Sequence, residues 1–125
     1  MITEDYVSFE VAKLLKEKGF NWQCHATYDI AVTGGKPQFS EYEVLNYFPY
    51  GMKNSDDKYG MVISAPTHQM AMKWLREVYD IKIMIRPYVD GTYSYEILNG
   101  FWYVNFDSYE NAVEESIKYC LENLI

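Results

Sequence analysis

The residues whose types and spacing could do chemistry in this 125-residue chain are two cysteines, two histidines and a pair of aspartates. Cys24 precedes His25, but neighbours on a strand point to opposite faces, so this thiol and imidazole do not form a nucleophile and its base. His68 falls in the first turn of a predicted helix, on its polar side, where we expect it to be solvated. Asp56 and Asp57 are adjacent in a predicted loop, which lacks the burial that separates the pKa values of an acid–base pair.

The cysteines and glycines also lack the spacing of metal or phosphate sites. Cys24 and Cys120 stand apart, with no C-x-x-C and no matching histidine, so we expect two reduced, packed thiols. The run Gly34-Gly35-Lys36 lacks the G-x-x-x-x-G-K-[ST] pattern of a phosphate loop and predicts a turn. The residues therefore predict no catalytic site, no metal and no cofactor.

Composition narrows the class of protein. The chain is 49% hydrophobic and 18% aromatic, enough apolar surface to fold, and its length suits one domain over residues 1–125. A net charge of -7 argues against binding nucleic acid or anionic lipid through a basic patch. The first five residues lack the features of a signal peptide, and no stretch is long and apolar enough for a membrane span. We therefore expect a cytoplasmic protein that does not bind membranes.

The elements that would position any site are clearest between residues 64 and 86. Thr67 is placed to cap a helix whose inner stripe is Met70, Ala71, Trp74, Leu75 and Val78. The apolar period then changes from 3.6 to 2 over Ile81 to Arg86, which predicts a strand. A helix that leads so directly into a strand is expected to lie across the sheet that the strand enters.

The remaining elements flank this stretch. Ser8 caps a predicted helix that runs to Lys18 and stops at Gly19. A half-buried strand is predicted over residues 22–30, with Trp22, Cys24, Ala26, Tyr28 and Ile30 inside and Gln23, His25, Thr27 and Asp29 outside. A short strand near residues 42–45, a surface loop over 49–60 and a brief strand over 61–63 follow. Ser108 caps the last helix, whose inner stripe is Tyr109, Ala112, Val113, Ser116, Ile117, Cys120, Leu121 and Leu124.

Two turns set the register of a three-stranded antiparallel meander. A three-residue loop ending in Gly91 pairs Ile85 with Tyr95 and Ile83 with Ile97, whereas a two-residue loop would place a glutamate on the isoleucine face. The Asn99-Gly100 dipeptide predicts a two-residue type I′ turn. That turn sets Ile97 opposite Trp102, Tyr95 opposite Val104 and Tyr93 opposite Phe106. The whole is an α+β fold in the order α-β-(β)-α-β-β-β-α, in which helices pack on the meander and on an N-terminal strand region.

The outer face of this meander mixes apolar and polar residues. Its predicted members are Met84, Leu98, Phe101 and Tyr103 together with Lys82, Arg86, Ser94, Glu96 and Asn105. This face is too apolar for an ordinary solvent-exposed surface and too polar for a fully buried core. Either residues 22–30 cover it, or it is a contact surface for a second copy or another protein.

Three helical runs carry a family resemblance: S-F-E-V-A-K-L-L-K-E-K-G-F (8–20), A-P-T-H-Q-M-A-M-K-W-L-R-E-V (65–78) and S-Y-E-N-A-V-E-E-S-I-K-Y-C-L-E-N-L-I (108–125). They resemble a family of short uncharacterised proteins of gut bacterial genomes, often encoded among phage-derived genes. The resemblance implies a small cytoplasmic protein and brings no site residues. From residue 67 onward the element order is also similar to a double-stranded-RNA-binding domain. The acidic start of the last helix, with Glu110, Glu114 and Glu115, has the wrong charge to bind phosphates.

Three functions follow as hypotheses. The first is a non-catalytic protein–protein interaction module that binds itself or an unknown protein, with the interaction surface Met84, Arg86, Leu98, Phe101, Tyr103, Glu110 and Glu114. The second is an acidic decoy or inhibitor of a basic protein surface, of the kind phage genes encode, which presents Glu110, Glu114, Glu115 and Glu122. The third is a small enzyme or ligand-binding protein with a pocket near Trp22, His25 and the long loop.

Overall fold

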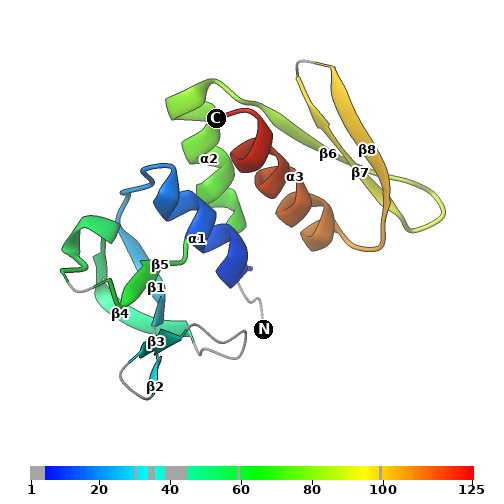
Figure 1. The fold of residues 1–125 in the computed structure, drawn as a ribbon. Helices are drawn as coiled ribbons and strands as arrows, with labels where there is room; N and C mark the ends of the chain where they lie inside the picture. Colours follow the sequence, from blue (N-terminus) through cyan, green and yellow to red (C-terminus); the bar gives the residue numbers. More distant parts are fainter. Residues whose placement is uncertain (1–4, 30, 34–35, 39–44, 59, 99) are drawn as a thin grey trace. The chain divides into compact units, whose positions relative to one another are not determined.

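The computed structural model describes residues 5–29, 31–33, 36–38, 45–58, 60–98 and 100–125. Within these residues the chain forms three α-helices, two three-stranded sheets and a two-stranded sheet, all antiparallel, which confirms the α+β class (Figure 1). The chain divides into two compact units: a first unit, Tyr6–Pro66, and a second unit, Thr67–Ile125 with Met1–Asp5. The single domain expected from the chain length stays a prediction.

In the first unit, helix α1 (Phe9–Glu17) begins and ends where its flanking residues predict. The Ser8 hydroxyl accepts a hydrogen bond from the Val11 N–H at 3.2 Å, as an N-cap does. At the other end Gly19 has φ +92, and the Phe20 N–H donates to the Leu15 carbonyl at 2.9 Å. This is the Schellman ending, which glycine favours because it adopts left-handed backbone without strain. The predicted cap and stop are confirmed.

Strand β1 (Cys24–Asp29) is the central strand of the sheet β4-β1-β5, between β4 (Leu45–Met52) and β5 (Val62–Ser64). The predicted alternation is confirmed at its start, where Cys24 and Ala26 are buried and His25 is exposed. Thr27, expected outside, is buried, and its hydroxyl donates to Asp29 Oδ1 at 3.0 Å. A strand in the middle of a sheet can be covered on both faces, so strict alternation is lost.

Strand β4 occupies part of the stretch that was expected to be a loop. The predicted strand near 42–45 lies largely outside the described residues, but β4 runs on to Met52. Gly51 has φ +78, and a Cβ there would lie 2.5 Å from Gln23 Cγ. The glycine therefore marks a bend and a close approach within a strand, where the sequence pattern had indicated a loop. The brief strand expected near 61–63 is confirmed as β5.

A short hairpin of β2 (Ala31–Thr33) and β3 (Lys36–Gln38) follows β1 and was not predicted. The predicted turn at Gly34-Gly35 lies between these two strands, outside the described residues.

A 3-10 turn, η1 (Asn54–Asp56), is held by buried polar contacts. The Asn54 amide Nδ2 donates to the Phe20 carbonyl at 2.8 Å, and Asn54 Oδ1 accepts from the Ser64 N–H at 2.9 Å. The Asn54 side chain therefore satisfies the Phe20 carbonyl and the Ser64 N–H, and it links the residues after α1 to β5.

Asp57 corrects the expectation of a solvated aspartate pair. Its side chain is 4% exposed and lies 2.6 Å from Lys16 Nζ of α1. Burial by itself would raise the pKa of Asp57, but hydrogen bonds from Lys16 and from the Met61 and Val62 backbone, together with the Lys16 charge, lower it overall. Asp56 is exposed, as predicted, and accepts from the Lys53 N–H at 2.9 Å.

In the second unit, helix α2 (His68–Tyr79) is capped by Thr67, whose hydroxyl accepts from the Met70 N–H at 3.2 Å. The inner positions Ala71, Trp74 and Leu75 are buried, as the pattern predicts. Val78 was expected on the same stripe but is 52% exposed. It lies in the last turn of the helix, just before Asp80 takes a left-handed conformation and turns the chain away.

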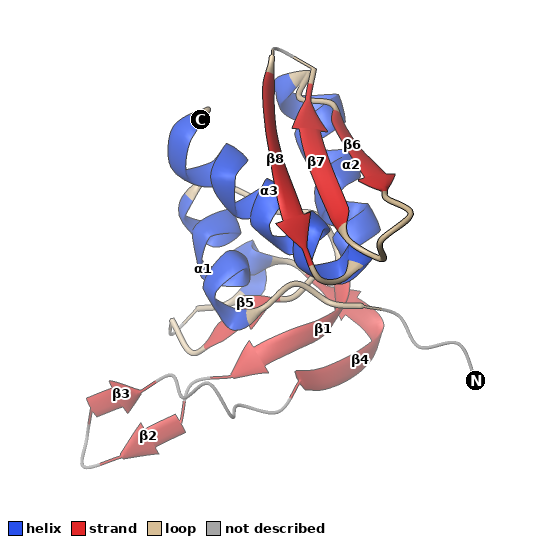
Figure 2. Cartoon of the chain, turned by 90° about the vertical axis from the view of Figure 1, so that its right-hand side faces the viewer, coloured by secondary structure: helices blue, strands red, loops and turns tan. Residues whose placement is uncertain are grey.

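The second unit also holds the sheet β6-β7-β8, formed by β6 (Ile83–Pro87), β7 (Tyr93–Ile97) and β8 (Phe101–Phe106). Helix α3 (Tyr109–Asn123) lies against all three strands, and α2 packs against α3 (Figure 2). The helix that covers the sheet is therefore α3, and the expectation that α2 lies across it is wrong.

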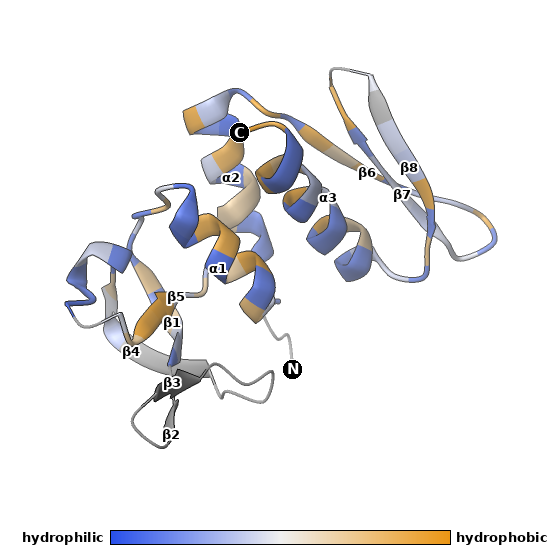
Figure 3. Cartoon of the chain, viewed as in Figure 1, coloured by the Kyte–Doolittle hydropathy of each residue, from blue (hydrophilic) through white to orange (hydrophobic). Residues whose placement is uncertain are grey.

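Helix α3 is amphipathic, with hydrophobic and hydrophilic residues alternating along its length (Figure 3). The Ser108 hydroxyl accepts from the Asn111 N–H at 3.1 Å, which confirms the predicted cap. Most of the predicted inner stripe is buried: Ala112, Val113, Ser116, Ile117, Cys120 and Leu121.

Candidate interaction surface

The β6–β7 hairpin has the predicted register. Ile83 pairs with Ile97, and Ile85 pairs with Tyr95. The connecting loop has three residues and ends in Gly91, which is left-handed with φ +88. The three-residue loop was predicted because a two-residue loop would place a glutamate on the isoleucine face, and this prediction is confirmed.

The β7–β8 hairpin has a different register. The sequence predicts Trp102 opposite Ile97, whereas Ile97 pairs with Phe101. The turn therefore has three residues and ends at Gly100, whose N–H donates to the Ile97 carbonyl at 3.1 Å and whose φ is +106. Glycine suits the third position of this bulged turn as well as the second position of a type I′ turn. The Asn-Gly dipeptide alone does not distinguish them.

A shift of one residue turns the side chains of a strand to the opposite faces. Tyr103 pairs with Tyr95, and their rings pack with centroids 5.2 Å apart on the inner side. Trp102 pairs with Glu96 instead and is 63% exposed. Val104 is also exposed. The predicted inward positions of Trp102 and Val104 and the predicted outward position of Tyr103 are therefore wrong.

A bulge near the end of β8 restores the predicted pairing. The register shifts between Tyr93 and Tyr95, and Tyr93 pairs with Phe106, as expected. Asn105 lies in this segment with φ +72, a left-handed conformation that asparagine tolerates better than most residues.

We call the side of the sheet that faces away from α3 the outer face; its members are Met84, Arg86, Ser94, Glu96, Leu98, Trp102 and Val104. Leu98 is 56% exposed, and Met84 is exposed as well. Residues 22–30, which the sequence analysis considered as a cover for this face, contribute β1 to a separate sheet in the first unit.

The expected surface residues are divided between the two faces. Met84, Arg86 and Leu98 lie on the outer face, as predicted. Phe101 pairs opposite the buried Ile97, and its side chain is outside the described part of the structure. The sequence pattern placed Trp102 on the inner face and therefore left it out of the candidate surface. A three-residue turn before β8 would have placed it on the outer face.

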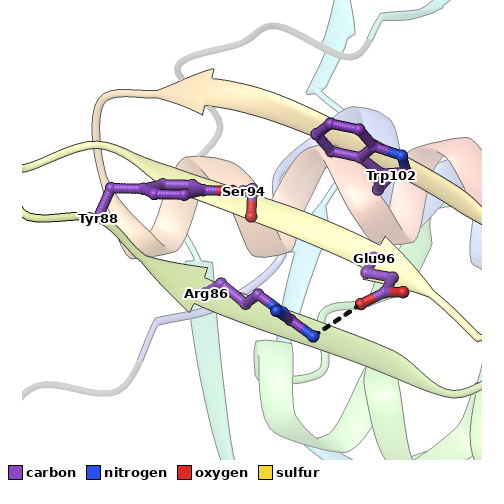
Figure 4. A pocket seen from close by; sticks show the side chains of 5 residues that line it. All are labelled: Arg86, Tyr88, Ser94, Glu96 and Trp102. Atoms are coloured by element: carbon purple, nitrogen blue, oxygen red, sulfur yellow. Dashed lines mark hydrogen bonds and ion pairs between the residues drawn. The ribbon is translucent and has the colours of Figure 1, made fainter.

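A hollow of about 240 Å³ lies on the outer face. It is lined by Arg86, Tyr88, Ser94, Glu96 and Trp102 (Figure 4). Arg86 Nη2 donates to Glu96 Oε2 at 3.3 Å, and both side chains are partly exposed. Tyr88 follows the end of β6 and Trp102 lies on β8, while the Arg86–Glu96 ion pair joins β6 to β7, so the hollow combines two aromatic rings with an ion pair.

The inner face carries a cluster of aromatic rings against α3. Tyr103 packs on Tyr119 of α3 with centroids 5.6 Å apart, and Tyr95 packs on Phe106 at 5.5 Å. Burial, followed by the neighbouring Tyr103, raises the pKa of Tyr95. A second hollow, of about 360 Å³, adjoins the cluster and is lined by Tyr95, Tyr103, Phe106, Glu115, Lys118, Tyr119, Glu122 and Asn123.

His68 and Glu114 form an internal contact that the sequence did not predict. His68 is buried, and its Nε2 lies 2.6 Å from Glu114 Oε2. The expectation of a solvated His68 is wrong, because α2 packs its first turn against α3. Glu110 is exposed at the start of α3, as predicted.

The two thiols are packed, as predicted. Cys24 and Cys120 are buried, reduced cysteines, and burial raises the pKa of each thiol to about 12. A thiol with so high a pKa is protonated at neutral pH and is a poor nucleophile. Neither hollow is lined by Trp22 or His25.

Among the residues the structure describes, no group of three or more histidine, cysteine, aspartate and glutamate side chains is placed to hold a metal ion. No helix in the described ranges is long and apolar enough to cross a membrane. Comparisons of the chain with protein-family models, with curated proteins and with solved structures give no match.

Proposed function

We propose that this chain is a non-catalytic protein–protein interaction module that binds through the outer face of β6-β7-β8. The observation that carries the proposal is the exposure of Met84, Leu98, Trp102 and Val104 on one side of one sheet. Single exposed apolar residues are normal, but a group on one face rimmed by polar residues is typical of a contact site.

The residue types on this face support the same function. Tryptophan, tyrosine, methionine and arginine are enriched in the cores of protein interfaces, and Trp102, Tyr88, Met84 and Arg86 all lie on or beside this face. Trp102 is one of the exposed apolar residues of this face and also lines the hollow together with Arg86. We therefore expect it to contribute most to binding, as buried tryptophans do in other complexes.

The acidic-decoy alternative is weakened by the contact of Glu114 with His68. A decoy must present its carboxylates to a basic partner, and Glu114 is already engaged within the unit. Glu110 and Glu115 remain exposed. The two functions differ in their response to salt, because screening weakens exposed charge pairs and has little effect on apolar contacts.

The experiment is affinity capture from the native host with three baits: the wild-type chain, Trp102→Ser and Val78→Ser. Val78 is the matched control, because it is an exposed apolar residue on α2, away from the sheet. We expect a protein that the wild type and Val78→Ser capture equally, that Trp102→Ser loses, and that stays bound at high salt. Equal capture by all three baits, or loss of the protein at moderate salt, would refute the proposal.

A further inference from the structure

The hollow of about 360 Å³ beside the tyrosine cluster combines aromatic rings with carboxylates. Tyr103 and Tyr119 form part of its wall, and their ring centroids lie 5.6 Å apart. Tyr103 is 44% exposed, so this wall is open to a ligand and is not sealed within the core. The faces of aromatic rings are electrostatically negative, and they attract cations.

Tyr95 contributes to this hollow a hydroxyl that the protein itself does not use. The residue is 3% exposed and lines the hollow, yet its hydroxyl makes no hydrogen bond to any described residue. Within the described ranges every fully buried side-chain oxygen and nitrogen has a partner, so this hydroxyl must reach the hollow. Burial raises its pKa, so the hydroxyl is neutral at pH 7 and is available to hydrogen-bond a ligand.

The charged side chains of the hollow leave it with a negative charge. They are Glu115, Lys118 and Glu122. Lys118 Nζ lies 3.9 Å from Glu122 Oε1, so these two charges balance each other. Glu115 is exposed and forms no ion pair or hydrogen bond with the described part of the chain. Burial is the main cause of the raised pKa of Tyr95, and the Glu115 charge adds to it, so this carboxylate lies within electrostatic reach of the Tyr95 hydroxyl.

Two wider features also favour a cation here. Glu122 and Asn123 lie in the last turn of α3, where the helix dipole places a partial negative charge. The chain as a whole has a net charge of -7, which attracts cations from solution. The hollow on the outer face differs, because its Glu96 is paired with Arg86 at 3.3 Å.

We propose that the tyrosine-lined hollow binds a guanidinium group, from an arginine side chain of a protein or from a free guanidino compound. A guanidinium is planar and weakly hydrated, so it stacks on aromatic rings such as those of Tyr103 and Tyr119. Its several N–H donors serve the Glu115 carboxylate and the Tyr95 hydroxyl together.

Other cations fit this set of groups less well. A lysine ammonium is strongly hydrated and does not stack, and a quaternary ammonium has no N–H to donate to the hydroxyl or the carboxylate. The volume is at the lower end of the range for ligand pockets, which suits one such group better than a cofactor. The hollow lies between α3 and strands β7 and β8, so the inference goes beyond the proposed function and does not depend on the outer face.

The test is a titration of the whole chain with N-acetyl-arginine amide, followed by NMR of the backbone amides and of the probe. N-acetyl-citrulline amide is the matched probe, because it has nearly the same shape without the charge. We expect the arginine probe to bind with ring-current shifts of its side-chain methylene protons, and the citrulline probe to bind roughly tenfold more weakly or less. N-acetyl-lysine amide should bind more weakly than the arginine probe. Free arginine distinguishes the two sources: a residue of a protein if the capped probe binds more tightly, a free guanidino compound if free arginine does.

Three variants then locate the site. Glu115→Gln should raise the dissociation constant of the arginine probe roughly fivefold or more, and Tyr95→Phe roughly threefold, because each removes one hydrogen-bond partner of the ligand. Glu110→Gln is the control, because it removes the same charge from an exposed position of the same helix that does not line the hollow. We expect it to bind the probe as the wild type does.

Folding does not confuse the reading of these variants. Glu115 is exposed and the Tyr95 hydroxyl has no partner in the described structure, so we expect all three variants to unfold at the urea concentration of the wild type. Equal weakening by Glu110→Gln and Glu115→Gln would show attraction by net charge alone and would overturn the inference. Equal binding of the citrulline probe, tighter binding of the lysine probe, or no saturable binding of the arginine probe would overturn it as well.

Discussion

The position of Trp102 can be tested by its effect on stability. Trp102 is 63% exposed, so truncation to alanine removes only the minor part of its surface that is buried, roughly 90 Å². At about 25 cal/mol per Å² this burial contributes at most about 2 kcal/mol, and we expect a loss near 1 kcal/mol in Trp102→Ala. Trp74 is 3% exposed, and Trp74→Ala should cost about 3–5 kcal/mol.

The measurement is urea unfolding followed by far-UV circular dichroism, because fluorescence changes when a tryptophan is removed. It should be made at low protein concentration, so that any loss of self-association does not add to the loss of folding free energy. If Trp102→Ala destabilises the protein as much as Trp74→Ala does, Trp102 points inward. The register of β8 would then be the one with a two-residue turn, and the outer face would lose its largest residue.

Three further predictions concern other buried contacts. Asn54→Ala removes both hydrogen bonds of a buried amide and should lower the free energy of unfolding by about 2–4 kcal/mol, measured by urea titration, and a loss below about 0.5 kcal/mol would contradict its role. The folded-state pKa of Asp57 is lowered, so its stabilising contribution is present above the unfolded pKa and is lost as pH falls through the folded pKa. The stability difference between wild type and Asp57→Asn should therefore be largest near neutral pH and shrink in acid, and a constant difference would exclude the pairing with Lys16. Cys24 and Cys120 should alkylate slowly with iodoacetamide in the native state and rapidly in denaturant, and fast native labelling would show that they are not packed.

The parts of the fold that local rules determine could be predicted from the sequence. Ser8, Thr67 and Ser108 each cap a helix, because a hydroxyl at this position satisfies an N–H of the first turn whatever the rest of the chain does. The β6–β7 register was predictable because a buried face excludes a glutamate, which leaves one loop length. Capping and face polarity are properties of a few neighbouring residues.

The rest depends on contacts that are distant in sequence. Trp102 and Tyr103 are both aromatic, so moving the strand by one residue exchanges two side chains of similar hydrophobicity, and polarity does not choose between the registers. His68 and Glu114 lie far apart in the chain, and their pairing depends on how α2 packs against α3. The outward placement of Met84 and Arg86 on β6 was therefore predicted correctly, and that of Tyr103 on β8 was wrong.

The chain passes between its two units twice, after Asp5 and after Pro66. Backbone hydrogen bonds hold both passages: the Val7 N–H donates to the Pro66 carbonyl at 3.0 Å, and the His68 N–H donates to the Asp5 carbonyl at 2.9 Å. The two ends of the segment 6–66 therefore lie close together, which is the arrangement of a module inserted into a chain. A gene that lost this segment could restore a continuous chain with a linker of very few residues.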